Sequence, residues 1–156
     1  MSGFVTPGTP NLTDFLTFLS NQVQIPSAAL PAGSPWPGYA LAQAIGLVVN
    51  PPAPPVPVAY SLACYNGATH ILFNITPDQP GETYFTNARS TAGFGLVQPS
   101  MGLIGAASDQ GTSSTTVVPD WAKTLTIGQL DFYKTAWGRS FLAWNQSYGP
   151  TIWGLT

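Results

Sequence analysis

Apolar residues recur at helical spacing along most of the chain, and the first such run begins at Asn11. Asn11 is a good helix-capping residue, and Asp14 would place a negative charge in the first turn. The apolar residues that follow share one side of a helix: Leu12, Phe15, Leu16, Leu19 and Val23. We therefore predict a helix over residues 11–23. Residues 1–10 before it are expected to form an extended arm, because two prolines restrict their backbone.

Three more helices are predicted before residue 95. The second ends at Asn50 and is supported by Tyr39, Leu41, Ala42, Ile45 and Val49. The PPAPP run that follows is expected to form a stiff polyproline corner. From Val58 the next positions lie alternately four and three apart, as in a buried bundle helix: Leu62, Tyr65, Thr69 and Leu72. This pattern predicts a central helix, and a short helix over Glu82–Thr91 comes after it.

The chain changes character over residues 96–119, where Ser, Thr, Gly and Val replace the helical pattern. A projecting loop or β-hairpin fits this composition. In residues 120–148 apolar and aromatic residues again lie mostly three or four apart. This spacing predicts a last helix, or a pair of helices interrupted at Gly138. Residues 149–156 are expected to form a second extended arm.

Together the elements predict a mainly α fold in one domain, residues 1–156. We expect a small bundle of about four to five helices, most of them within residues 11–95. The Ser/Thr/Gly-rich loop or hairpin and the two arms would extend from this bundle.

The composition indicates that much of the surface is covered by other molecules. The 156 residues include only four basic and six acidic residues, whereas 44% are hydrophobic. An ordinary soluble domain carries charges at roughly one position in four. A surface so poor in charge is expected to lie against neighbouring subunits. The basic residues are scattered, which argues against a dedicated nucleic-acid binder.

Membrane insertion and export are not expected. No stretch of about 18 apolar residues could span a bilayer, and the first residues lack the pattern of a signal peptide. Synthesis in the cytoplasm is the expectation.

Catalytic and metal-binding patterns are weak in this sequence, so we predict neither an enzyme nor a cofactor. The single histidine, His70, lies six residues after the single cysteine, Cys64, and about 600° of helical rotation separates them. A local Cys-His pair is therefore excluded, and His70 is expected in a structural hydrogen-bond network. A small hydrolase that uses His70 remains an alternative. Asp78 and Glu82 are interrupted by a Pro-Gly pair and do not form a metal-binding pair.

The few cations and the aromatic residues near the C-terminal end allow two interpretations each. Arg89 and Arg139 could be solvated, or could form ion pairs with Asp109 or Asp131 of another subunit. Asp131 could instead pair with Lys134 along one helix. The aromatic series is expected to pack in the core rather than to form a stacking platform: Phe132, Tyr133, Trp137, Phe141 and Trp144.

Three segments in the same order resemble the head-to-tail adaptor, or head-completion, proteins of tailed bacteriophages. They are ATHILFNITPD at 68–78, GLIGAASDQGTSSTTVVP at 102–119 and DFYKTAWGRSFLAW at 131–144. The last one fits a T-x-x-G-x-x-[FYW] element through Thr135, Gly138 and Phe141. The resemblance spans roughly residues 58–148. It implies a small helical bundle with a long projecting loop or hairpin.

The resemblance implies a structural virion protein of the neck, below the portal vertex. Such a protein forms a ring of about twelve copies, contacts the portal and the tail or neck proteins, and extends the channel for the genomic DNA without reading its sequence. Residues expected at the subunit interface are Asp109, Thr112, Ser113, Ser114, Thr115, Thr116, Val117, Arg89 and Arg139. We hypothesise that unpaired apolar residues of the two arms dock on portal or neck proteins: Phe4, Val5, Trp153 and Leu155. A capsid decoration, tail-tube or tail-completion protein is the alternative.

Overall fold

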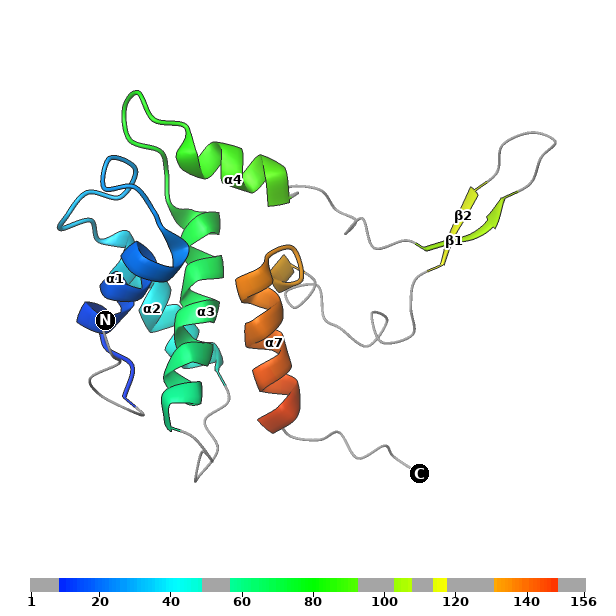
Figure 1. The fold of residues 1–156 in the computed structure, drawn as a ribbon, viewed down its shortest axis with the longest axis horizontal. Helices are drawn as coiled ribbons and strands as arrows, with labels where there is room; N and C mark the ends of the chain where they lie inside the picture. Colours follow the sequence, from blue (N-terminus) through cyan, green and yellow to red (C-terminus); the bar gives the residue numbers. More distant parts are fainter. Residues whose placement is uncertain (1–8, 49–56, 93–102, 108–113, 118–130, 149–156) are drawn as a thin grey trace.

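A computed structural model describes residues 9–48, 57–92, 103–107, 114–117 and 131–148 (Figure 1). The helices are α1 (Leu12–Phe18), the π-helical turn η1 (Leu19–Val23), α2 (Trp36–Leu47), α3 (Pro57–Ile75), α4 (Tyr84–Ala92) and α7 (Ala136–Tyr148). The strands are β1 (Leu103–Ala107) and β2 (Ser114–Val117). The prediction of a mainly helical bundle is confirmed.

Helix α3 is the centre of the bundle. It packs against α2 and α7, which Figure 1 shows on its two sides, while α1 packs on α2 and α4 packs on α3. Nearly every residue of α3 from Tyr60 to Phe73 is buried. Gly67 permits the close approach of α7, because a Cβ at that position would lie 2.5 Å from Phe141 Cδ2. The buried central helix predicted from the sequence is therefore confirmed.

Helix α1 begins at the predicted cap but buries a different side than expected. The Asn11 side chain accepts a hydrogen bond from the Asp14 N–H at 2.9 Å, and the Asn11 N–H donates to the Tyr65 hydroxyl of α3 at 3.2 Å. The rings of Phe15 and Phe18 contact Tyr65 and are buried. The predicted side was wrong in part, because two of its leucines stay at the surface: Leu12, 45% exposed, and Leu16, 44% exposed.

Helix α2, which the sequence predicted, turns its smaller apolar residues toward the core. Its buried residues are small or medium in size: Pro37, Ala40, Leu41 and Ala44. The small side chains allow α2 to approach α3 closely. Larger apolar residues face outward instead: Tyr39, 59% exposed, Ile45, 40% exposed, and Leu47, 55% exposed.

Helix α7 runs through Gly138 without a break, so the predicted interruption there was wrong. The glycine serves a close contact instead, because a Cβ at Gly138 would lie 2.0 Å from the Phe132 carbonyl oxygen. The part of the predicted last element before residue 131 lies outside the described residues.

Strands β1 and β2 pair in antiparallel register, with Leu103 opposite Val117 and an irregularity between Ile104 and Ala106. The remainder of the 96–119 segment lies outside the described residues, as do the PPAPP run and residues 1–8 and 149–156. Whether the 96–119 segment projects to a neighbour stays a prediction.

Candidate functional site

The His70 side chain joins α3 to the residues before α7. It is 1% exposed, and its ring stacks on Phe132 with 4.4 Å between centroids. His70 Nδ1 lies 2.8 Å from Thr135 Oγ1, and His70 Nε2 lies 3.3 Å from Asp131 Oδ2. Asp131 also pairs with Lys134, whose Nζ lies 2.9 Å from Asp131 Oδ1. The hydrogen-bond network expected around His70 is therefore present, and so is the Asp131–Lys134 pair.

Thr135 connects this network to the first turn of α7. Its Oγ1 accepts a hydrogen bond from the Gly138 N–H at 2.9 Å, so Thr135 is the N-cap of the helix. A Cβ at Gly138 would also lie 3.0 Å from His70 Nδ1, which leaves room for no side chain there. The sequence element T-x-x-G-x-x-F thus describes a capped helix start, a close approach to the buried imidazole and an aromatic contact with α3.

The burial of His70 favours its neutral form. Loss of hydration lowers the pKa of the imidazole below its ordinary value of 6.5, and the nearby Asp131 carboxylate opposes this shift. In the neutral form, a proton on Nε2 satisfies both neighbours, because Nε2–H donates to Asp131 and Nδ1 accepts from the Thr135 hydroxyl. The hydroxyl, imidazole and carboxylate then form one chain of hydrogen bonds.

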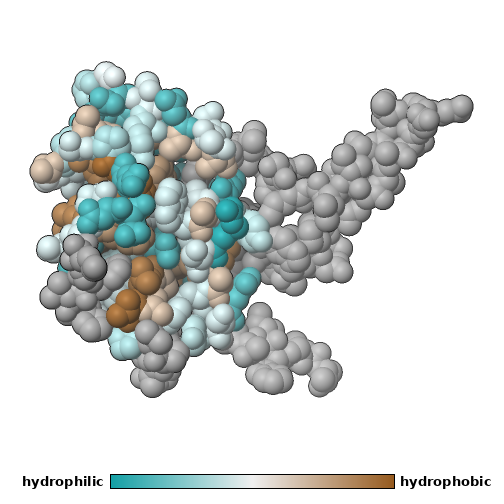
Figure 2. All heavy atoms as spheres, viewed as in Figure 1, coloured by the Kyte–Doolittle hydropathy of each residue, from teal (hydrophilic) through white to brown (hydrophobic). Residues whose placement is uncertain are grey.

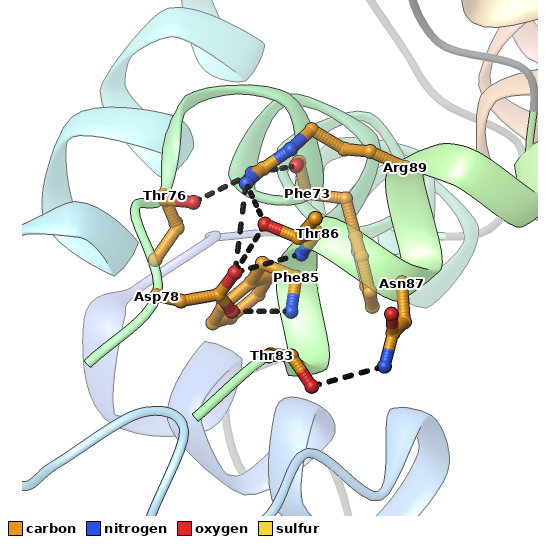
Figure 3. Close-up of polar contacts among 8 residues, drawn as sticks. All are labelled: Phe73, Thr76, Asp78, Thr83, Phe85, Thr86, Asn87 and Arg89. Carbon is orange, nitrogen blue, oxygen red and sulfur yellow. Dashed lines mark hydrogen bonds and ion pairs between the residues drawn. The ribbon is translucent and has the colours of Figure 1, made fainter. Parts of the chain in front are cut away.

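A second polar cluster joins the end of α3 to the start of α4 (Figure 3). The Asp78 carboxylate accepts hydrogen bonds from the Phe85 N–H at 2.7 Å, the Thr86 N–H at 2.9 Å and the Thr86 hydroxyl. In the opposite direction, Arg89 Nη1 donates to the carbonyl oxygens of Thr76 at 2.7 Å and Phe73 at 3.1 Å. Asp78 therefore caps α4, and Arg89 of α4 caps α3.

These hydrogen bonds also favour the ionised form of the Asp78 carboxyl group. The hydrogen bond from the Thr86 hydroxyl, with those from the two backbone N–H groups, lowers the pKa of Asp78 below its ordinary value of 3.8. The Arg89 guanidinium, 3.9 Å from Asp78 Oδ2, acts in the same direction. The cluster thus depends on an ionised carboxylate.

The two arginines expected at a subunit interface have partners within their own chain. Arg89 is bound to the end of α3, and Arg139 Nη1 donates to the Tyr133 carbonyl oxygen at 3.1 Å. Asp131 is held by His70 and Lys134. Ion pairs of these residues with another subunit stay a prediction.

Only some of the other predicted site residues belong to the part of the chain that the structure describes. Ser114, Thr115, Thr116 and Val117 form β2, paired with β1. The rest lie outside the described residues: Asp109, Thr112, Ser113, Phe4, Val5, Trp153 and Leu155.

Most of the predicted aromatic series packs against the core: Phe141 is buried, and Phe132, Trp137 and Trp144 are partly buried against it, whereas Tyr133 is half-buried outside this cluster. Trp137 stacks on Phe73 at 5.1 Å and Phe132 stacks on Phe141 at 4.8 Å. Trp144 packs against the same core, beside Tyr60.

The Tyr60 hydroxyl and the Cys64 thiol are buried together, and burial raises their pKa values to about 12 and about 11. Cys64 is therefore an unreactive thiol.

Two hollows open on opposite parts of the described surface. One, of about 550 Å³, lies between α4 and the start of α7 and is walled by Phe73, Tyr84 and Trp137. The other, of about 490 Å³, lies between α1 and the connector that leads to α2. The second hollow includes the exposed Leu12 and Leu16, which the sequence pattern had placed in the core.

The exposed apolar residues of α1 and α2 lie in a stretch that carries little charge. Residues 9–48 contain one charged residue, Asp14. Five of their large apolar side chains are exposed: Leu12, Leu16, Tyr39, Ile45 and Leu47. Figure 2 shows hydrophobic residues that reach the surface over α1 and α2. We call these five residues the α1–α2 surface.

Metal and membrane sites are not found in the described part of the chain. Among the described residues, no group of three or more His, Cys, Asp or Glu side chains could hold a metal ion. Within the same residues, no helix has both the length and the apolar character needed to cross a bilayer.

Comparisons with protein-family models, curated proteins and solved structures gave no match for this chain.

Proposed function

We propose that this chain is a structural virion protein, a head-to-tail adaptor that forms a ring between the portal and the tail or neck proteins. The observation that carries the proposal is the α1–α2 surface. Five exposed large apolar side chains within a stretch that has one charged residue are costly to leave in water. Contact with identical copies would remove them from water, and each subunit of a ring contacts its neighbours through two different surfaces.

The contact between α3 and α7 brings together two of the three segments on which the resemblance rests. Two of the three resembling segments, 68–78 and 131–144, meet at His70, Thr135 and Gly138. Residues of both segments therefore contribute to the same contact, the packing of the first turn of α7 against His70 of α3. Agreement between short motifs is more informative when their residues touch than when they are scattered over a fold.

The use of cations within the chain fits a channel that DNA must pass through. Arg89 binds the end of α3, Lys134 pairs with Asp131, and Arg139 binds a backbone carbonyl. Each additional cation that faced a phosphate would add a salt-dependent attraction and slow the movement of DNA. A subunit whose cations are engaged elsewhere, as these three of the described residues are, would contact passing DNA only weakly.

Other virion roles remain alternatives within the same class. A capsid decoration or tail-completion protein would also need an uncharged contact surface. A tail-tube protein would need long paired strands, and the described residues are mainly helical, which favours the adaptor.

The test is assembly with the portal. Purified chain, alone and mixed with portal protein, would be measured by native mass spectrometry, and particles would be analysed for the chain by mass spectrometry. We expect rings of about twelve copies, binding to the portal and presence in the particle neck. A chain that stays monomeric at high concentration and is missing from particles would refute the proposal.

One observation favours a different class of function enough to test it. Thr135, His70 and Asp131 form a hydroxyl–imidazole–carboxylate chain, the arrangement that activates a hydroxyl nucleophile in some hydrolases. The Thr135 side chain is 6% exposed, however, and its oxygen already accepts the Gly138 N–H. A structural role therefore fits better.

An ester hydrolysis assay with p-nitrophenyl acetate separates the two functions. If the network is structural, the folded chain and a folded His70→Gln variant hydrolyse the ester at the same slow rate. A hydrolase would lose most of its rate on this substitution while its circular dichroism spectrum stayed unchanged.

A further inference from the structure

The groove beside α1 is built to receive an apolar chain segment. Leu12, Leu16 and Leu19 form one wall, and residues of the connector form the other, from Ile25 to Pro37. None of the residues that line it is charged. Its polar side chains are three serines: Ser20, Ser27 and Ser34. Its volume of about 490 Å³ lies in the range of sites that enclose a ligand or a few side chains.

The wall of the groove that α1 forms leaves two large apolar side chains in contact with water. Leu12 and Leu16 keep 45% and 44% of their surface exposed, although Leu19, one helical turn further, is buried. A charged occupant would lose its hydration in this groove without gaining an ionic partner. The occupant that fits is therefore an uncharged segment with large apolar side chains.

We propose that the groove binds the C-terminal segment, residues 149–156, of a neighbouring copy of the same chain. The sequence of this segment, GPTIWGLT, has no charged side chain. In an extended strand, alternate residues point to the same face, so Trp153 and Leu155 would enter the groove together. Pro150 favours such an extended backbone. The inference deepens the proposed ring, on which it rests, by naming the segment that joins adjacent copies.

The positions of donor and groove favour a neighbouring copy over the same chain. Figure 1 shows α1 and the connector before α2 on one side of α3, and α7 on the other. The segment follows Tyr148, the last residue of α7. When copies stand side by side in one orientation, the donor side of each copy faces the groove side of the next, which is a head-to-tail contact that can close into a ring.

The length of the segment is sufficient for such a contact. Eight extended residues reach at most about 26–29 Å. This exceeds the distance of about 8–10 Å between the axes of packed helices. The segment is therefore long enough to cross a helix–helix contact between two subunits.

A disulfide exchange experiment with full-length chains tests this contact. A Leu16→Cys chain is mixed with a separate Trp153→Cys chain under mild oxidation, so that a mixed disulfide can form only between copies. The buried native Cys64, whose pKa is raised to about 11, gives little background. The matched control replaces Leu16→Cys by Ser90→Cys, which lies on the exposed side of α4, outside both the groove and the α1–α2 surface.

We expect the mixed disulfide of the Leu16→Cys pair to form at least about ten times faster than that of the Ser90→Cys pair, because bound segments hold the two thiols at high effective concentration. Equal rates would overturn the inference. So would faster disulfide formation within one chain that carries both Leu16→Cys and Trp153→Cys, since that result places the segment in its own groove.

The outcome is separable from that of the proposed function. Selective cross-linking in a chain that is missing from particles would support the groove contact and refute the adaptor. A ring that assembles in the neck, with the Trp153→Cys chain cross-linked only to portal protein, would support the adaptor and refute this contact.

Discussion

The α1–α2 surface and the α3–α4–α7 side of the molecule use polar residues in opposite ways. Residues 9–48 contain one charged residue and leave five large apolar side chains exposed. On the other side, the charged groups Asp78, Arg89, Asp131 and Lys134 hold helix ends and a buried imidazole. These four charged residues therefore fix the internal geometry of the α3–α4–α7 side, and Asp14 is the one charged residue in the stretch that carries the α1–α2 surface.

This division has a physical reason. An exposed ion pair contributes little to folding, whereas a side chain that satisfies the free backbone groups of a helix end is worth more. A chain with few charges gains most by placing them at such ends. The α1–α2 surface, without charges, is then suited to contact with another protein.

The largest difference between the two regions is expected from matched glycine substitutions. Gly138→Ala should destabilise the chain by about 3 kcal/mol, because the new Cβ would clash with the Phe132 carbonyl oxygen, which is backbone and cannot move aside cheaply. Gly46→Ala in α2 meets nothing within 4 Å and should stabilise the chain by about 0.5–1 kcal/mol. Urea denaturation measures both. Similar effects at the two positions would contradict the packing described for α7.

A smaller difference is expected between the two arginines. Arg89→Met removes the donors for the Thr76 and Phe73 carbonyls and should destabilise the chain by about 2 kcal/mol. Arg139→Met breaks one exposed hydrogen bond, to the Tyr133 carbonyl, and should change stability by less than about 0.5 kcal/mol. Thermal unfolding followed by circular dichroism distinguishes them. Equal losses would mean that the α3–α4 caps are not special.

Lowering the pH should reduce the stability of the folded chain in two steps, one caused by His70 and one by Asp78. The pKa of His70 is lowered in the folded chain, so the unfolded chain binds a proton first, and stability falls as the pH drops below about 6.5. The pKa of Asp78 is also lowered, so its contribution is present above about 3.8 and is lost at lower pH.

Melting temperatures measured from about pH 7.5 to about pH 3 test these two steps, because this range includes the ordinary pKa values of both groups. His70→Gln should remove the first decline, and Asp78→Asn should remove only the second. A first decline that survives in the His70→Gln variant would show that another group causes it.

The smallest effect on folding is expected on the α1–α2 surface. Tyr39→Lys should change the free energy of unfolding by less than about 0.5 kcal/mol, since the side chain is 59% exposed, yet it should reduce self-association. Ser90→Lys on the exposed side of α4 is the matched control for added charge. Sedimentation equilibrium reports the association. Equal association of the two variants would remove the distinction between the surfaces.

The sequence pattern predicted the helices better than it predicted their buried sides. Asn11 and the buried α3 followed from local rules of capping and spacing. The buried side of α1 was predicted only in part, because its apolar residues cover a wide arc and Leu12 and Leu16 lie at one edge of that arc. The buried side of α2 could not be predicted, because apolar residues lie all around this helix. A pattern that is apolar on several sides carries no single direction.

The two polar clusters could not be predicted from local sequence patterns, because their residues lie apart in the chain and meet only in the fold. Thr135 and His70 are 65 positions apart, and Asp78 reaches its partners across a turn. Gly138 looked like a helix break, although its close contact with Phe132 explains it. In the T-x-x-G element the glycine lies three positions after the threonine, which is the spacing between an N-cap side chain and the backbone N–H that it binds. This spacing was the one local signal in the sequence for the cluster around His70.

The account depends on the α1–α2 surface being covered by other copies of the chain. Hydroxyl-radical footprinting of dilute monomer and of concentrated, assembled protein tests this directly. We expect Leu12, Leu16 and Tyr39 to lose most of their reactivity on assembly. Unchanged reactivity of these three side chains in an assembled oligomer would contradict the account.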